Sequence, residues 1–172
     1  MGLIFITGIA GTGKSTLVKE LSTRDYEAHD ADEKLSYWAN KASGQKVPVS
    51  NHALATDPYF FEEHDWYINK HGVEKLAEEA THKPIFICGS VANEKEVWNY
   101  FEKVFCLYVD DDTLIKRIKN RPDKDFGKSE HELVHLLKLN KALQPKYKSL
   151  GAIVIDATQP VDKIADEIIE NL

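Results

Sequence analysis

Short apolar segments recur along this chain and alternate with stretches of helical periodicity. Two of them, residues 85–88 and 104–109, are continuous rather than alternating, which is typical of strands covered on both faces. We predict strands over residues 3–7, 26–29, 85–89, 104–109 and 152–156. Helical patterns predict helices over residues 14–22, 31–41, 63–80, 94–102, 111–120, 129–147 and 161–171. Strands that alternate with helices predict an α/β fold, a parallel sheet with helices on both faces.

The length of 172 residues fits a single domain, 1–172, with a core that needs no metal or disulfide. A net charge of −6 argues against nucleic acid as the main partner. The two cysteines, Cys88 and Cys106, lie in apolar runs and are expected to pack as free thiols. No leader-like segment or long apolar stretch is evident, so we expect a cytoplasmic protein with no membrane contact. Monomer and homodimer both remain open.

Residues 8–15 read GIAGTGKS and match the phosphate-binding loop pattern G-x-x-x-x-G-K-[ST]. The pattern follows a predicted strand and opens a predicted helix, which is the context that such a loop requires. Its lysine can reach the β- and γ-phosphates of a nucleotide, and its serine hydroxyl can bind Mg²⁺. The nucleotide-binding residues expected here are Gly8, Gly11, Thr12, Gly13, Lys14, Ser15 and Thr16.

Asp30 and Asp32 follow the second predicted strand, where ligands bind in open parallel sheets. One carboxylate can hold Mg²⁺ while the other accepts the proton of an attacking hydroxyl. The alternative is that one of them only caps the next helix. Because a cap needs a single residue, the pair favours the catalytic interpretation.

Arg117 and Arg121 stand four residues apart near the end of a predicted helix. One guanidinium can stack on a base while the other pairs with phosphate oxygens. A solvated basic face is the alternative, but lysine would serve that purpose equally well. The charged segment that follows, with Pro122 stopping the helix, predicts a lid over about residues 117–130.

Together these motifs resemble the P-loop small-molecule kinases, the superfamily of adenylate, shikimate and gluconate kinases. The resemblance implies a three-layer fold with sheet order 2-3-1-4-5, a lid that bears the arginine pair, and a site for ATP and Mg²⁺. It places the adenine pocket beside Gln159 and Pro160. It also implies Ser15 and Asp30 as metal ligands, with Lys14, Asp32, Arg117 and Arg121 as the catalytic residues.

The acceptor region, about residues 33–80, departs from the arginine-rich acceptor sites of nucleoside monophosphate and shikimate kinases. It contains no arginine, so an anionic acceptor would need Lys34, Lys41 or Lys46 in its place. Its aromatic residues can stack on a ring or a sugar face; they are Tyr37, Trp38, Tyr59, Phe60, Phe61, Trp66 and Tyr67. We therefore expect a neutral small-molecule acceptor, nucleoside or sugar-like first, with a shikimate-like acid next.

Three other functions stay open at this stage. A nucleoside monophosphate kinase would need a cationic acceptor site, and a non-catalytic nucleotide-binding regulator would bind ATP without transfer. His131, Glu132 and His135 match H-E-x-x-H, in which two histidines bind zinc and the glutamate acts as a base. No obvious third ligand accompanies them, so a zinc hydrolase is the weakest of the three.

Overall fold

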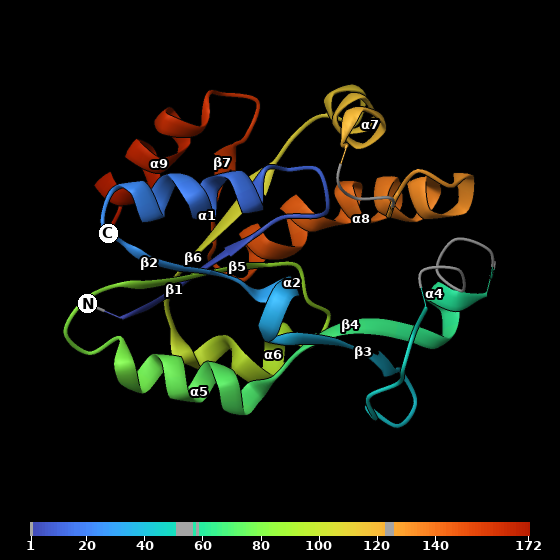
Figure 1. Ribbon diagram of the computed structural model, residues 1–172, viewed down its shortest axis with the longest axis horizontal. Helices are drawn as coiled ribbons and strands as arrows, with labels where there is room; N and C mark the ends of the chain where they lie inside the picture. The colour runs from blue at the N-terminus through green and yellow to red at the C-terminus, as the bar shows by residue number, and fades with distance from the viewer. Residues whose placement is uncertain (1, 51–56, 58, 123–125) are drawn as a thin grey trace.

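The computed structural model describes residues 2–50, 57, 59–122 and 126–172, and its centre is a five-stranded parallel sheet (Figure 1). The strands are β1 (Leu3–Thr7), β2 (Glu27–Asp30), β5 (Ile85–Gly89), β6 (Phe101–Tyr108) and β7 (Ile153–Asp156). Their order is β2-β5-β1-β6-β7. When only these five strands are numbered along the chain, their order across the sheet is 2-3-1-4-5. The predicted fold class and strand order are therefore confirmed.

Helices cover both faces of the sheet. In Figure 1, α1 and α9 lie above the sheet, and α5 and α6 lie below it. The helices are α1 (Lys14–Thr23), α2 (Ala31–Lys34), α4 (Phe60–Glu63), α5 (Lys70–Glu79), α6 (Glu94–Val97), α7 (Asp111–Asn120), α8 (Glu130–Ser149) and α9 (Val161–Glu170). None of the helices in the described part of the chain is long and apolar enough to cross a membrane.

The core lies on both faces of the two central strands. Every residue of β1 and β5 is buried, as their continuous apolar sequences predicted. Cys88 and Cys106 are buried free thiols, and burial raises the pKa of both. They pack as small apolar side chains, in agreement with the prediction.

A second, two-stranded antiparallel sheet replaces parts of two predicted helices. The helix expected over 31–41 ends at Lys34 and gives way to β3 (Ser36–Asn40). The helix expected over 63–80 is interrupted by β4 (His64–Ile68) and resumes at Lys70. Aromatic residues favour strands, and two cross-strand aromatic pairs, Tyr37 with Tyr67 and Trp38 with Trp66, stabilise this hairpin. Both helix predictions were wrong over these stretches.

The helix predicted over 94–102 is also shorter than expected. It ends at Val97, a 3-10 turn covers Trp98–Tyr100, and β6 already begins at Phe101. The Phe101 ring stacks on Phe5 of β1 with centroids 4.7 Å apart. This packing draws residues 101–103 into the sheet, because an aromatic side chain gains more from core burial than from an exposed helix end.

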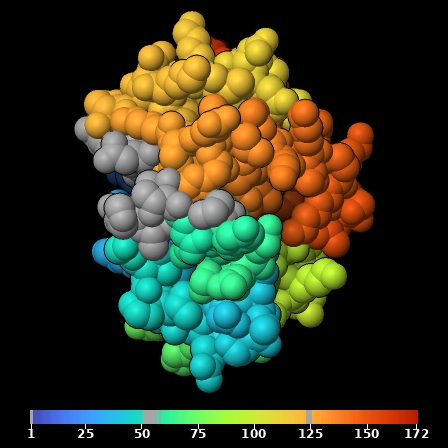
Figure 2. All heavy atoms as spheres, turned by 90° about the vertical axis from the view of Figure 1, so that its right-hand side faces the viewer, coloured from blue at the N-terminus to red at the C-terminus, as the bar shows by residue number. Residues whose placement is uncertain are grey.

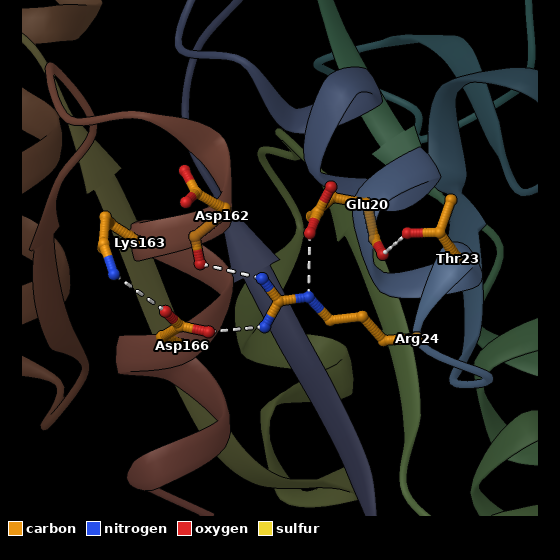
Figure 3. Close-up of polar contacts among 6 residues, drawn as sticks. All are labelled: Glu20, Thr23, Arg24, Asp162, Lys163 and Asp166. Atoms are coloured by element: carbon orange, nitrogen blue, oxygen red, sulfur yellow. Dashed lines mark hydrogen bonds and ion pairs between the residues drawn. The ribbon is translucent and has the colours of Figure 1, made fainter.

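Arg24 fastens α1 to α9 (Figure 3). Its Nε donates to Glu20 Oε1 at 2.8 Å within its own helix, and its Nη1 donates to Asp166 Oδ1 at 2.6 Å. Its Nη2 donates to the backbone oxygen of Asp162 at 3.0 Å. Hydrogen bonding to Arg24 lowers the pKa of Asp166. One of the three arginines is thus structural, since a planar guanidinium can satisfy three acceptors at once.

Replacing Arg24 with Met should lower the melting temperature, because α9 loses its polar attachment to α1. Lys163→Met is the matched control, since Lys163 makes a single 3.5 Å ion pair with Asp166 in the same network. We expect a clearly smaller decrease for the control in thermal denaturation followed by circular dichroism. Equal melting temperatures for the two variants would show that the Arg24 contacts do not hold these helices together.

Candidate functional site

The phosphate-loop motif joins β1 to α1 with the geometry that its glycines predict. Gly13 is the N-cap of α1 and has a φ of 102°, a left-handed conformation that side-chain-bearing residues rarely adopt. At Gly8 a Cβ atom would lie 2.5 Å from Thr12 Oγ1, so no side chain fits there. Thr12 is buried, and its hydroxyl donates to the Ile9 backbone oxygen at 2.9 Å, which fixes the turn.

Lys14 lies inside this turn rather than in solvent. Its side chain is only 6% exposed, and its ammonium donates to the backbone oxygens of Gly8 and Ile9. The Lys14 ammonium is therefore held inside the turn that the phosphate loop forms. A buried cation beside a helix N-terminus favours an anion.

Asp30 and Ser15 connect the loop to the end of β2. Ser15 Oγ donates to Asp30 Oδ2 at 2.6 Å, and Asp30 Oδ1 accepts from the backbone N–H of Asp32 at 3.1 Å. Asp30 thus caps α2 and contacts the phosphate loop at the same time. The capping interpretation therefore holds for Asp30, while its role in binding Mg²⁺ stays a prediction that its contact with Ser15 is compatible with.

Asp32 is engaged differently. Its Oδ1 accepts from the indole Nε1 of Trp66 at 2.9 Å, and within the described residues Oδ2 has no hydrogen-bond partner. The side chain is exposed and lines the cleft described below. Asp32 therefore has one oxygen fixed and the other available to a ligand.

Gly89 lets α2 approach the sheet closely. A Cβ atom at this position would lie 2.8 Å from the Cβ of Ala31, which sits between the two aspartates. The end of β5 therefore passes directly beneath α2. This close approach fixes how far α2, with the two aspartates on either side of Ala31, lies from the sheet.

A cleft of about 1330 Å³ runs from the phosphate loop to the hairpin β3–β4. Its walls come from the loop, α7, α8, the hairpin and residues 90–92 after β5. Figure 2 shows α8 passing between α7 and the segment that carries α4 and β4. Of the predicted site residues, those that line it are Gly11, Thr12, Gly13, Lys14, Ser15, Thr16, Asp32, Arg117, Arg121 and Gln159.

Gly8, Asp30 and Pro160 are outside this lining. Gly8 lies beneath the loop, where its backbone oxygen accepts from Lys14, and Asp30 lies behind Ser15. Pro160 is the N-cap of α9. These three residues are set back from the surface of the cleft, and Asp30 is connected to it through Ser15.

Arg117 connects two segments at the phosphate-loop end of the cleft. Its Nη2 donates to the Ala157 backbone oxygen at 2.9 Å, and its Nη1 lies 3.4 Å from the Thr12 backbone oxygen. The guanidinium therefore joins the phosphate loop to the segment that precedes α9. Gln159 lies in that same segment, with its Nε2 3.3 Å from the Asp156 backbone oxygen.

Arg121 is the C-cap of α7 and lies just beyond its last turn. Its Nη2 donates to the Phe126 backbone oxygen at 3.1 Å, while its buried Nε has no partner among the described residues. Burial lowers the pKa of this guanidinium. A partly buried cation with an unused donor is suited to binding an anion. The predicted lid, 117–130, includes residues 123–125, which lie outside the described residues, so it stays a prediction.

The glutamate of the H-E-x-x-H pattern takes part in helix capping. Glu132 is buried, and its Oε2 accepts from the N–H groups of Gly127 and Ser129 at 3.1 and 3.2 Å and from Ser129 Oγ at 2.7 Å. This carboxylate fixes the start of α8 and is not available as a base. The described residues contain no group of three or more His, Cys, Asp or Glu side chains that could hold a metal ion.

His135 contributes to the contact between α8 and the hairpin side of the cleft. Its ring stacks on Phe61, with centroids 4.0 Å apart and planes 5° from parallel. Desolvation by burial lowers the pKa of His135, and Lys41 lowers it further. The neutral imidazole therefore stabilises this contact.

Sequence reasoning missed the polar contacts that hold the hairpin. The buried side chain of Asn93 accepts from the backbone N–H of Ile68 at 2.8 Å and donates to its oxygen at 3.0 Å. Trp66 was expected in the acceptor region, but its hydrogen bond to Asp32 was not predicted. No periodic signal marks either contact, because both join segments far apart in the sequence.

The sheet order and the loop define the chain as a P-loop nucleotide-binding α/β protein. A family model described as "AAA domain" matches residues 4–137. The chain therefore belongs to this AAA domain family. No curated protein matches its sequence.

Solved structures with the same fold include three small-molecule kinases. Deoxyadenosine kinase from M. mycoides with bound dATP has a TM-score of 0.61 at 19% identity, over 98% of both chains. Shikimate kinase from Bacteroides thetaiotaomicron has a TM-score of 0.64 at 17% identity, over 99% of this chain and 97% of that one. A gluconokinase from Sinorhizobium meliloti 1021 has a TM-score of 0.53 at 16% identity, over 96% of this chain and 88% of that one. The P-loop kinase fold that the motifs implied is therefore confirmed.

Acidification should destabilise the protein through His135. Because the pKa of His135 is lower in the folded than in the unfolded state, its contribution to stability is complete above about pH 6.5 and declines as the pH falls below that value. Melting temperatures measured between pH 7.5 and 5 should show this decline, and His135→Phe should reduce it.

The control for this experiment is His71→Ala, because the His71 side chain is 90% exposed. That variant should retain the wild-type decline. A decline of the same size in His135→Phe would mean that another group is responsible.

Proposed function

We propose that the protein is an ATP-dependent kinase that transfers the γ-phosphoryl group to a hydroxyl of a neutral small molecule. The observation that carries this proposal is that the phosphate loop and the open carboxylate of Asp32 line the same cleft. A phosphate donor and a hydroxyl acceptor bound there would face each other without water between them. The shared fold with the three kinases above supports the same class of activity.

On the donor side, the loop and Lys14 would hold the β- and γ-phosphates. Arg117, which lines the cleft as Gln159 does, would stack its flat guanidinium on the adenine base. Ser15 Oγ and Asp30 Oδ2, 2.6 Å apart, are hard oxygen ligands of the kind that Mg²⁺ prefers. A magnesium ion held by these two residues would supply positive charge at the phosphates.

On the acceptor side, Asp32 would orient the hydroxyl and take its proton. The acceptor oxygen forms a bond to the γ-phosphorus while the bond to the β–γ bridging oxygen breaks, and ADP leaves with that electron pair. Arg121 lines the cleft, and its unused Nε would stabilise the charge that develops on the transferred group.

The character of the cleft favours a neutral acceptor with a ring. Trp38 and Trp66 line it from the hairpin, and apolar residues of α8 line it as well, namely Leu139, Ala142 and Leu143. None of Lys34, Lys41 and Lys46 contributes to the lining. Lys146 does, but its ammonium is paired with the buried Glu94 at 2.6 Å. A nucleoside is the first candidate, because its base fits between aromatic and aliphatic surfaces.

The proposal is tested by measuring ADP release with Mg·ATP against a panel of acceptors. The panel contains nucleosides, nucleoside monophosphates, gluconate, other sugars and shikimate. We expect turnover with a neutral member, nucleosides first. Transfer only to monophosphates would identify a nucleoside monophosphate kinase, and ATP binding without any transfer would identify a regulator.

Lys14→Ala and Asp32→Ala should separate donor binding from transfer. Lys14→Ala should lower kcat by about a hundredfold or more, because it removes a charge at the phosphates. Asp32→Ala should lower kcat by about a hundredfold as well, since it removes the proton acceptor, but with the affinity for Mg·ATP in calorimetry largely kept. A strong loss of ATP affinity in Asp32→Ala would contradict its assigned role.

A further inference from the structure

Trp66 and Asp32 meet across the acceptor half of the cleft although they are 34 residues apart in sequence. The indole Nε1 donates to Asp32 Oδ1 at 2.9 Å, and both residues line the cleft. A hydrogen bond between a neutral donor and a carboxylate is stronger than one between neutral groups. The contact joins the hairpin to the short helix α2.

The indole is itself fixed from several sides. The Trp66 backbone oxygen accepts from the N–H of Ala92 at 2.8 Å, which ties β4 to the segment after β5. Ile68 lies two residues after Trp66 on β4, and the Asn93 side chain binds both its backbone N–H and its backbone oxygen. The Trp38 ring packs against Trp66 with centroids 5.0 Å apart. The donor that reaches Asp32 is thus part of a well-supported strand.

The two aspartates differ in a way that gives this contact a purpose. Asp30 uses Oδ1 for the N–H of Asp32 and Oδ2 for Ser15. Asp32 uses only Oδ1, for Trp66, and Oδ2 is without a partner in the part of the chain that the structure describes. One fixed oxygen restricts the rotation of the carboxylate, and the second stays available to a ligand.

We propose that Trp66 is a positioning residue, which holds Asp32 through Oδ1 so that Oδ2 meets the acceptor hydroxyl. This inference rests on the proposed kinase function and gives Trp66 a role beyond the aromatic surface that it presents to the acceptor. The hydroxyl proton passes to Oδ2 as the acceptor oxygen bonds to the γ-phosphorus. A freely rotating carboxylate would occupy the reactive orientation for only part of the time.

The first measurement tests the contact without any turnover. Spectra of ¹⁵N-indole-labelled protein report the side-chain N–H groups of the three tryptophans, Trp38, Trp66 and Trp98. The signal lost in Trp66→Phe identifies Trp66. In Asp32→Ala we expect that signal to move and to exchange faster with solvent, while the Trp98 signal stays in place. An unmoved Trp66 signal would overturn the inference.

The second measurement tests the consequence for transfer. The acceptor is the panel member on which the wild-type protein acts fastest. Trp66→Phe keeps the aromatic surface and removes the donor, so kcat should fall by about tenfold while the KM for ATP changes by less than about twofold. Trp38→Phe is the matched control, because it alters the same aromatic cluster without touching Asp32. It should change mainly the KM for the acceptor.

Asp32→Asn completes the design, because in Asp32→Asn the effect of Trp66→Phe on kcat should disappear. A tenfold effect that persists in Asp32→Asn would assign Trp66 to folding or stacking and overturn the positioning role. Equal kcat for Trp66→Phe and the wild-type protein would do the same, with the kinase proposal intact. No transfer by the wild-type protein to any panel member would overturn the kinase proposal and this inference together, even with the indole contact present.

Discussion

The hydrogen bond between Ser15 and Asp30 is the contact on which the geometry of the site depends. It connects the first turn of α1, which follows the phosphate loop, to the end of β2, two strands away from β1 in the sheet. Because Asp30 also caps α2, any movement of the loop is transmitted directly to the helix that carries Asp32. The carboxylate of Asp30 therefore fixes the donor half and the acceptor half of the cleft relative to each other.

The central sheet was predictable because burial on both faces leaves a direct trace in the sequence. Strands β1 and β5 and the part of β6 from Val104 onward are continuous apolar runs, and few other structures produce such runs at this length. The hairpin β3–β4 left no such trace, because its strands are only half-buried and mix aromatic with polar residues. Its formation depends on cross-strand ring pairs and on Asn93, and these contacts are between segments that the sequence separates.

The candidate site likewise contains residues that the sequence identified and contacts that it did not. The residues of the phosphate loop act locally, so their spacing alone identified them, and Gly13 shows the conformation that the motif requires. The partners of Asp32 and Glu132 could not be predicted, because each depends on which side chain the fold brings to it. Glu132 shows the risk in the opposite direction, since a zinc-like spacing arose from a carboxylate that closes the start of a helix. Arg24 likewise bears the charge of a ligand-binding residue but serves two helices instead.

The narrow gap between Gly89 and Ala31 restricts where acidic groups can arise in this molecule. Any residue with a side chain at position 89 would collide with Ala31 of α2, so β5 cannot end in a carboxylate while α2 stays in place. The acid beside the phosphate loop comes instead from β2, the outermost strand on that side of the sheet, which ends at Asp30. The residue at position 89 and the position of α2 therefore depend on each other. A bulkier residue at the end of β5 would require α2 to move, and the two aspartates would move with it.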